Sequence, residues 1–276
     1  MRRPLRILAL IGFLAATLGL AAGCSDSSAG SGTLQMNMVD APSPIVGLEA
    51  IDVVFDSVRV HKSGQANPED KGWITVLDNT LPEAERTFDL FDLVNGNFAV
   101  LGLADLSAGK YTQIRVIVES AAITIAGNTD PLTIPSGMQT GIKIVSPFTV
   151  VDGEVLELLL DFDAAQSVSS TRLGYTLDPV IRVVQADQTG SIAGTVTAGG
   201  FPSGPPVVSA YEAGTTTLVT TTYVDDTTGE YELEGLEPGD YDLTVDALDA
   251  IDTPYSGSQD GVTVAAGQTT TVNFSL

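Results

Sequence analysis

The stretch GEYELEGLEPGDYDLTVDA, residues 229–247, decides the fold class of this chain. Tyr231 and Leu233 alternate with glutamates, so one face of an extended strand is apolar. The glycines and the proline at positions 235–239 predict a turn. The apolar residues of the returning strand, which again share one face, are Tyr241, Leu243 and Val245. This two-residue period, with turn residues at the reversal, predicts an all-β fold.

Seven short runs rich in Val, Thr and Tyr follow one another between residues 187 and 276, separated by Gly, Pro, Asp and Asn. Seven strands in about ninety residues are typical of an antiparallel β-sandwich. A domain boundary is predicted at Ala186–Gly190, because this polar run separates two strand-rich parts and no Lys or Arg follows Arg182.

This C-terminal part resembles the carboxypeptidase regulatory-like, or transthyretin-like, domain family. The residues that carry the resemblance are Gly190–Val196, Asp226–Tyr231 and Gly235–Leu243. The resemblance covers the whole part and implies a sandwich that spaces, stiffens or binds, and it does not imply peptidase activity. Because such sandwiches often resemble carbohydrate-binding folds, glycan binding is the first specific functional hypothesis.

The part from residue 33 to residue 186 also consists of strand-like runs between turn residues. It predicts another β-sandwich, with one helix candidate at Thr87–Gly96, where three apolar residues share a face. Pro179 interrupts the last run of this part and predicts an edge or a bend.

From Thr33 to about Val184, the sequence resembles a family of bacterial lipoprotein domains known as domain of unknown function 4382. The matching residues are Asp40–Pro42, Val58–His61, Trp73, Phe88–Leu90, Asn95, Gly96, Gly109–Tyr111, Pro135–Gly141, Asp161–Ala164, Ser167 and Leu177–Val180. The resemblance implies a fold and a compartment, and little chemistry.

The first part contains a stretch that is similar in sequence to the motif at residues 229–247. Residues 95–116 align with residues 228–245 in a way that pairs Phe98 with Tyr231 and gives the first copy a longer loop. The side chains of the aliphatic residues after Tyr111 would then point to the strand face opposite to that of Tyr111, which predicts a bulge or burial on both faces. Two sandwiches of related design and convergent turn chemistry both remain open as explanations.

The composition excludes several classes of function. The chain has 35 acidic and 12 basic residues, for a net charge of −23, and such a surface repels nucleic acid. It would attract divalent cations, and a solvated acidic exterior is the simpler interpretation. Cys24 and His61 are the only cysteine and histidine, so neither an intrachain disulfide nor a Cys/His zinc site is available. His61, at a strand end beside a turn, is expected to be a surface or edge residue.

Residues 1–23 have the layout of a cleaved signal peptide: a basic start, an apolar run too short to span a membrane comfortably, and small residues. The following LAAGC sequence resembles the bacterial lipoprotein box, which implies lipidation of Cys24, by chains such as palmitate, after cleavage before it. Residues 24–32 then form the lipidated cysteine and a flexible tether. The expected location is the cell envelope, and the outer membrane in a Gram-negative cell, because Ser25 follows the cysteine. An ordinary secretory signal is the alternative.

Asp161 and Asp163 follow three leucines and lie two residues apart, so their side chains share one face of a strand. Together with Asp40 from another loop, they are candidate ligands of Ca²⁺, a cation that prefers several oxygen donors. In the alternative interpretation, the aspartates accept hydrogen bonds from backbone N–H groups of the next turn, which Ser167 could cap. A glycosidase pair is disfavoured, since its carboxylates usually lie on different strands.

The sequence therefore predicts a non-catalytic, lipid-anchored envelope protein with two antiparallel β-sandwich domains in tandem, at residues 33–186 and 187–276. Its expected partners are the membrane, through the lipid, and either a polysaccharide or another envelope protein. A binding module predicts an exposed aromatic patch, with Trp73, Tyr223 and Tyr255 as candidates. A subunit of a surface assembly predicts an unprotected edge strand. A metal-dependent enzyme predicts a cleft around the paired aspartates.

Overall fold

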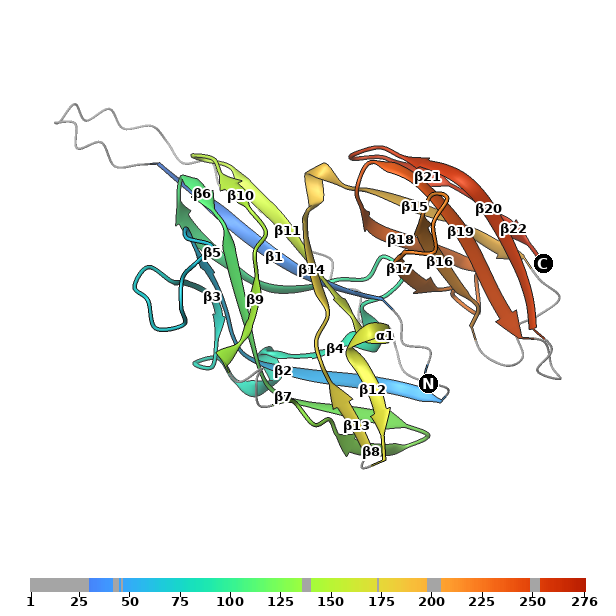
Figure 1. Ribbon diagram of the computed structural model, residues 1–276, viewed down its shortest axis with the longest axis horizontal. Coiled ribbons are helices and arrows are strands. Elements are labelled where there is room, and N and C mark those ends of the chain that lie inside the picture. The colour runs from blue at the N-terminus through green and yellow to red at the C-terminus, as the bar shows by residue number, and fades with distance from the viewer. Residues whose placement is uncertain are drawn as a thin grey trace.

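The computed structural model describes residues 30–41, 45, 47–135, 140–172, 174–197, 205–248 and 254–276. These residues form an all-β protein, as predicted, with two separate apolar cores. Figure 1 shows the corresponding bodies side by side, the first coloured blue to yellow and the second orange to red. The predicted signal peptide and Cys24 lie outside the described residues. In the part that is described, no helix has the length and apolar character needed to cross a membrane.

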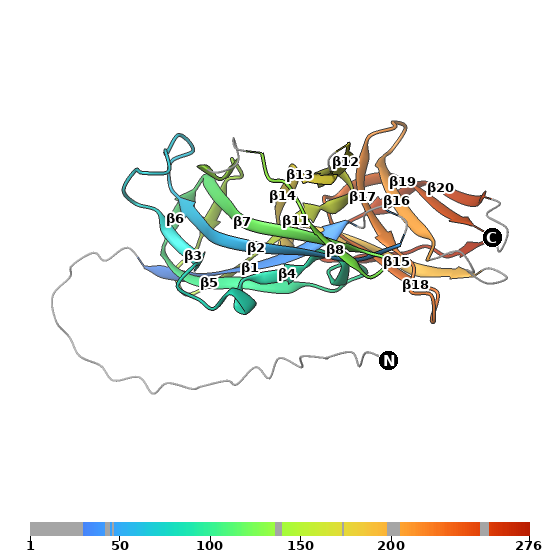
Figure 2. The same ribbon diagram turned by 90° about the horizontal axis from the view of Figure 1, so that it is seen from below.

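Two sheets enclose the first core. Sheet A has the strand order β14-β11-β1-β5 and is built from β1 (Ser31–Ala41), β5 (Ala99–Ser107), β11 (Val155–Asp163) and β14 (Ile181–Gln185). Sheet B has the order β3-β2-β7-β8 and is built from β2 (Leu48–His61), β3 (Ile74–Asp78), β7 (Gln113–Ile125) and β8 (Asn128–Pro131), with β4 (Thr87–Asp89) on β2 and β9 (Ile142–Ile144) on β7. Figure 2 shows the long strands β2 and β7 running alongside one another.

Short strand pairs and one helical turn complete the first body. They are β6 (Gly109–Tyr111) with β10 (Phe148–Val150), β12 (Val168–Thr171) with β13 (Gly174–Leu177), and α1 (Ala164–Ser167). Chain direction is antiparallel in most of the pairs, whereas β1 and β11 run parallel. The break predicted at Pro179 lies between β13 and β14, and β14 is an edge strand of sheet A.

The strand β11 shows how the sequence pattern builds the core. Leu158, Leu160 and Phe162 are buried in the first core, while Val155, on the opposite parity, is 67% exposed. Since alternate side chains point to opposite faces of a strand, this alternation fixes the register of β11 beside β1.

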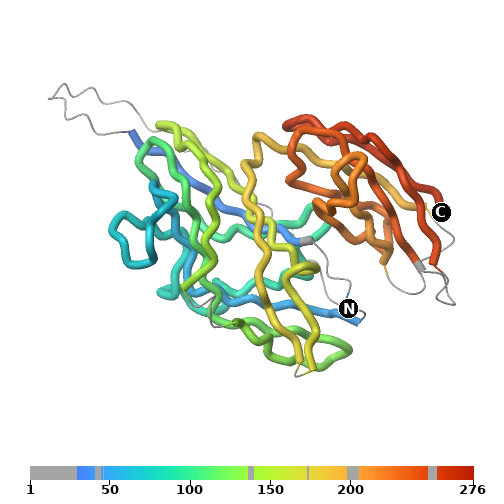
Figure 3. The backbone as a smooth tube through the Cα atoms, viewed as in Figure 1, coloured from blue at the N-terminus to red at the C-terminus, as the bar shows by residue number. Residues whose placement is uncertain are grey.

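Two facing sheets enclose the second core as well. One sheet is built from β15 (Gly190–Thr197), β18 (Glu230–Leu236), β21 (Thr269–Thr271) and β22 (Phe274–Ser275), and the other from β16 (Val207–Glu212), β17 (Leu218–Tyr223), β19 (Gly239–Leu248) and β20 (Pro254–Val264). The run TTTVNFSL divides into β21 and β22, both parallel to β15. At the break, the Asn273 side chain accepts a hydrogen bond from the Thr195 N–H. The backbone enters this body through the turn Ala186–Gln188 (Figure 3).

Two local predictions are wrong. The helix candidate at Thr87–Gly96 is the strand β4 followed by a single 3-10 turn, Leu90–Asp92. Pairing of β4 with β2 keeps the segment extended, and the Asp89 carboxylate accepts the N–H of Phe91 and so starts the turn. The tether is also shorter than predicted, because Ser31 and Gly32 already belong to β1 and pair with β5.

The two bodies share the repeated motif in structure as well as in sequence, but the predicted alignment of the two copies is wrong. The Tyr111 hydroxyl donates to the carbonyl oxygen of the residue four places earlier at 3.2 Å, and the Tyr241 hydroxyl does the same at 2.7 Å. Counting back five residues from each tyrosine pairs Leu106 with Leu236 without a gap, and both leucines are fully buried. The common unit is therefore Leu-x-x-Gly-x-Tyr, a tyrosine corner closing a strand reversal, and Phe98 is not the counterpart of a core residue.

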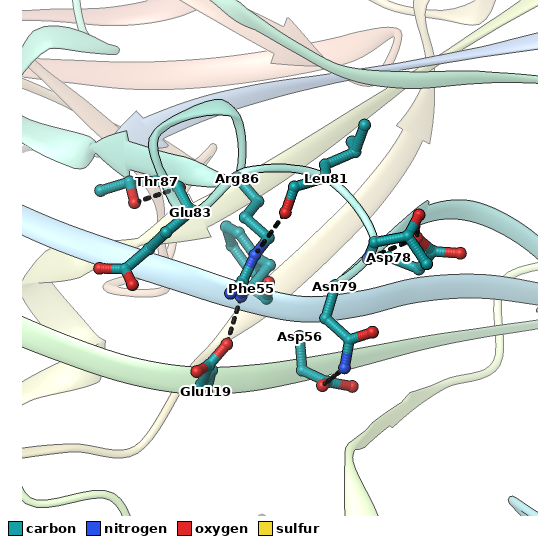
Figure 4. A network of polar contacts seen from close by, with 10 residues as sticks. Phe55, Asp56, Asp78, Asn79, Leu81, Glu83, Arg86, Thr87 and Glu119 are labelled. Atoms are coloured by element: carbon teal, nitrogen blue, oxygen red, sulfur yellow. Dashed lines mark hydrogen bonds and ion pairs between the residues drawn. The ribbon is translucent and has the colours of Figure 1, made fainter.

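Arg86 fixes a loop onto the outer surface of sheet B. Its guanidinium donates to the Phe55 carbonyl oxygen at 2.9 Å and pairs with the Glu119 carboxylate. Figure 4 shows this side chain reaching from its loop across β2 to Glu119 on β7. The buried charge of Arg86 thus has both a carboxylate and carbonyl partners.

Candidate functional site

Asp161 lies at the junction of the two bodies and is paired with Arg182. Arg182 Nη2 and Nε donate to Asp161 Oδ2 at 2.7 and 3.3 Å, and Arg182 Nη1 donates to the carbonyl oxygen of Gly235, in the second body, at 3.0 Å. Burial raises the pKa of Asp161, and the charge of Arg182 acts in the opposite direction. This carboxylate therefore holds the arginine that joins the bodies.

Asp163 and Asp40 both accept backbone N–H groups of one turn. Asp163 Oδ1 accepts from Gln166 N at 2.8 Å and is the N-cap of α1, while Asp40 Oδ1 accepts from Ala164 N at 2.9 Å. Within the described residues, no three Asp, Glu, His or Cys side chains are grouped as metal ligands. A calcium site at Asp40, Asp161 and Asp163 stays a prediction, and these contacts favour the alternative in which the carboxylates organise the end of β11.

Further contacts join the two bodies. The Asn95 N–H donates to Thr222 Oγ1 at 3.0 Å, and the Tyr223 ring packs against Phe91 with 5.8 Å between ring centroids. Burial, and secondarily the charge of Asp40, raises the pKa of Tyr223 to about 12. Tyr223 therefore belongs to the junction rather than to an exposed aromatic patch.

The carboxyl group of Glu234, at the junction, makes the free energy of unfolding depend on pH. Burial raises its pKa to about 7, and the carboxylates of Glu232 and Glu157 add to this effect. Between the ordinary value of 4.5 and about 7, the folded chain holds a proton that the unfolded chain releases. The free energy of unfolding is therefore expected to fall as pH rises through this window.

The variant Glu234→Gln is expected to remove this component of the pH dependence, which is on the order of 2 kcal/mol after allowance for partial solvent exposure. Denaturant unfolding at pH 4.5 and pH 8 measures it as the difference between wild type and variant. Glu237→Gln, on the exposed turn after the same strand, is the control and is expected to keep the wild-type pH dependence. Equal pH dependence in wild type and Glu234→Gln would contradict the assignment.

Exposed apolar side chains gather on the outer face of sheet A. We call this set the apolar platform; its members are Phe98 and, on β5 and β11, Val100, Leu103 and Val155. Phe98 is 54% exposed and Leu103 is 60% exposed. Single exposed apolar residues are ordinary on a protein surface, whereas large contiguous apolar patches are typical of interaction surfaces. The members of the platform share one sheet face, with polar side chains of β1 between them.

Amide and carboxylate groups lie between the members of the apolar platform. The strand register places Gln35 between Leu103 and Glu157, and Asn37 between Val100 and Leu159. Gln35 Nε2 donates to Asn37 Oδ1 at 3.2 Å, and Asn37 Nδ2 donates to Glu157 Oε1. These hydrogen bonds hold three planar polar groups in fixed positions beside the apolar surface.

A cleft of about 250 Å³ separates the platform from the second body. Phe98, Asn37 and Glu157 line its first side, and Glu234 and Gln268 line the second. Apolar surface with a few fixed polar groups is the usual composition of a small-molecule site. Sugar rings match it chemically, because their C–H faces pack on apolar side chains while their hydroxyls reach amides and carboxylates.

Trp73 and His61 lie together on the outer face of sheet B. Their ring centroids are 5.0 Å apart, and Trp73 Nε1 donates to the carbonyl oxygen of Asn67 at 2.8 Å. His61 Nδ1 accepts from Ser63 N at 2.9 Å, so Nε2 carries the ring proton and donates to the carbonyl oxygen of Lys71 at 3.0 Å. As expected of an edge residue, His61 closes the loop between β2 and β3. Tyr255 is half-buried on β20.

The sequence alone did not identify Phe98 as a surface residue. The Leu-x-x-Gly-x-Tyr spacing before Tyr111 is the signal that would have corrected its place, since it leaves Phe98 outside the repeated core unit. Arg59 and Arg115 each lie between two apolar core residues of their strands, and this alternation is a comparable signal that both arginines point to the outer face of sheet B.

The fold and the junction define a protein of two packed β-sheet bodies with a cleft between them. The chain belongs to the family described as domain of unknown function (DUF4382), whose model matches residues 31–179, over half of the sequence. No curated protein matches the chain. The resemblance of residues 187–276 to the carboxypeptidase regulatory-like family stays a prediction.

The solved structures that match this chain share little sequence with it, and their TM-scores are low. The TIE protein of Bacillus anthracis has 11% identity and a TM-score of 0.24 over 89% of this chain, which spans about half (51%) of that protein. GBS52, the minor pilin of Streptococcus agalactiae, has 15% identity and a TM-score of 0.22, with 87% of this chain and 94% of that chain covered. BcpA, the major pilin subunit of Bacillus cereus, has 9% identity and a TM-score of 0.24, with 89% and 69% covered.

Proposed function

We propose that this chain is a non-catalytic saccharide-binding module of the cell envelope, anchored through a lipid on Cys24. The apolar platform with its fixed amides is the observation that carries the binding function. The lipoprotein-like leader supports the location. The non-catalytic character is supported by the engagement of Asp161 and Asp163, the best acid–base candidates of the sequence, in structural contacts.

The proposed ligand is a neutral saccharide segment lying along the cleft. Phe98, which lines the cleft, would pack against the C–H face of one sugar ring, and Leu103, farther along the outer face of β5, against that of another, which removes apolar surface from water. Glu157, which is partly exposed and held in place by buried Asn37, would accept hydrogen bonds from hydroxyls at the rings' edges. The adjoining depression of about 570 Å³, which shares Glu157 and Ala186 with the cleft, extends the same surface and would admit a chain rather than a single sugar.

The variant Phe98→Ala is expected to weaken saccharide binding about tenfold, because one aromatic contact at the centre of a site is worth more than about 1 kcal/mol. The detergent-solubilised full chain is run in native gels containing dextran, β-glucan or glucomannan, and retardation gives the affinity. Since Phe98 is largely exposed, the free energy of unfolding is expected to stay within about 0.5 kcal/mol of wild type.

The matched control is Leu81→Ala, an exposed apolar residue on a loop outside the cleft. It is expected to be retarded as strongly as wild type. The proposal is overturned if no polysaccharide retards the wild-type chain, or if Leu81→Ala and Phe98→Ala lose affinity equally.

A further inference from the structure

A row of basic side chains crosses the outer face of sheet B, although the chain as a whole is strongly acidic. Arg59 on β2 is paired in register with Arg115 on β7, and Arg115 is paired with Lys143 on β9. The Trp73 ring lies over both guanidinium groups, with 5.6 Å from its centroid to Cζ of Arg59 and 5.5 Å to Cζ of Arg115. We call Arg59, Arg115 and Lys143 the basic row.

The two arginines of the basic row differ from Arg86 and Arg182 in their partners. Arg86 pairs with Glu119, and Arg182 pairs with Asp161. Within the described residues, neither Arg59 nor Arg115 has a carboxylate at ion-pair distance. Arg115 is only 5% exposed, and the one hydrogen bond of its guanidinium among these residues goes to the carbonyl oxygen of Thr140 at 2.6 Å.

Unfilled hydrogen-bonding capacity is concentrated at the basic row. Arg59 Nε and Arg115 Nε are buried donors without a partner in the described part of the chain. Gln113 Oε1, on the same face of β7, is a buried acceptor without a partner there, although the amide nitrogen of Gln113 donates to the Ala66 carbonyl oxygen at 3.2 Å. Buried groups left unpaired in this way are costly, and an external partner would relieve the cost.

Folding alone gives little reason for this arrangement. Like charges directly opposite one another on neighbouring strands repel. Burial, and secondarily the charge of Arg59, lowers the pKa of Arg115. Contact with the Trp73 ring compensates part of the repulsion. An anionic group next to the row would compensate it more fully, because a guanidinium presents a planar pair of donors that fits a carboxylate or a sulfate.

We propose that the basic row and Trp73 bind a saccharide unit that carries an anionic group, either a uronate carboxylate or a sulfate ester. The anion would lie against Arg59 and Arg115, with exposed Lys143 at its outer side, and the sugar ring would lie beside Trp73. This site is on sheet B, whereas the apolar platform is on sheet A, so either site can fail without the other.

Trp73 is the only tryptophan of the chain, so its fluorescence reports on this site alone. The full chain in detergent is titrated with oligogalacturonate, dextran sulfate, neutral dextran and inorganic sulfate. We expect a saturable change of emission with oligogalacturonate or with dextran sulfate, and the two titrations distinguish the carboxylate from the sulfate ester. The affinity is expected to fall as salt rises, because the contact is between charges.

The variants Arg59→Gln and Lys143→Gln are expected to raise the dissociation constant about tenfold or more. Lys143 is exposed, so its substitution tests the site even if the Arg59 variant folds poorly, and Arg172→Gln, an exposed arginine outside the row, is expected to bind as wild type. The proposal is overturned if neither charged polymer changes the emission, if neutral dextran acts equally well, if inorganic sulfate binds as tightly as the polymers, or if Arg172→Gln weakens binding as much as Lys143→Gln.

Discussion

Replacement of Arg182 by methionine is expected to lower the free energy of unfolding by about 3 kcal/mol at pH 7. The substitution leaves the Asp161 carboxylate buried without its counter-charge and removes the hydrogen bond to the Gly235 carbonyl oxygen. The loss should be smaller at pH 4, because an unpaired Asp161 is then readily protonated and buries no charge. At pH 7 the folded state must either bury the charged carboxylate or bind a proton from dilute solution, and both cost free energy. Denaturant unfolding at both pH values measures the difference.

The double variant Asp161→Asn with Arg182→Met separates the pair from other roles of the arginine. Removing both charges is expected to restore more than half of the lost free energy, since an amide next to a methionine carries no uncompensated charge. A double variant that is no more stable than Arg182→Met would show that Arg182 stabilises the chain by contacts other than Asp161.

Replacement of Cys24 by serine is expected to move the protein from the membrane fraction to the soluble fraction almost completely. The predicted anchor has several acyl chains on one residue, and each buried methylene contributes about 0.8 kcal/mol, so the lipid dominates membrane affinity. The described part of the chain supplies no membrane-spanning helix. Fractionation after an alkaline wash measures the distribution, and mass spectrometry of the N-terminal peptide detects the lipid.

Ser28→Ala, in the same serine-rich segment, is the matched control and is expected to remain in the membrane fraction with its lipid. If Cys24→Ser also remained there, the apolar run of residues 7–22 would be an uncleaved membrane anchor. If wild type were soluble and unlipidated, the leader would be an ordinary secretory signal.

The fold class followed from the sequence because period-two alternation is a local signal. Leu158, Leu160 and Phe162 alternate as a one-sided strand must, and the structure buries all three. The helix at Thr87–Gly96 failed for a non-local reason, since the β2 ladder that holds residues 87–89 extended is more than thirty positions away in sequence. Parallel pairing of β1 with β11 likewise depends on a strand over a hundred residues distant.

The candidate sites were harder to predict than the fold. Asp161 and Asp163 share a strand face, as their spacing required, yet their function depends on Arg182 and on the α1 backbone, which the spacing does not reveal. The basic row arises from strand register: Arg59 and Arg115 are 56 positions apart and meet only because β2 and β7 pair in one particular alignment. Register of this kind is set by the whole hydrophobic pattern and the turns.

Calorimetric melting of the full chain with calcium and with chelator tests most directly whether the predicted ligands Asp40, Asp161 and Asp163 are structural. Because their carboxylates already accept hydrogen bonds from protein donors, the melting temperature is expected to agree within about 1 °C in the two conditions. A rise of several degrees in calcium that disappears in Asp161→Asn would contradict this and establish a cation site at the junction.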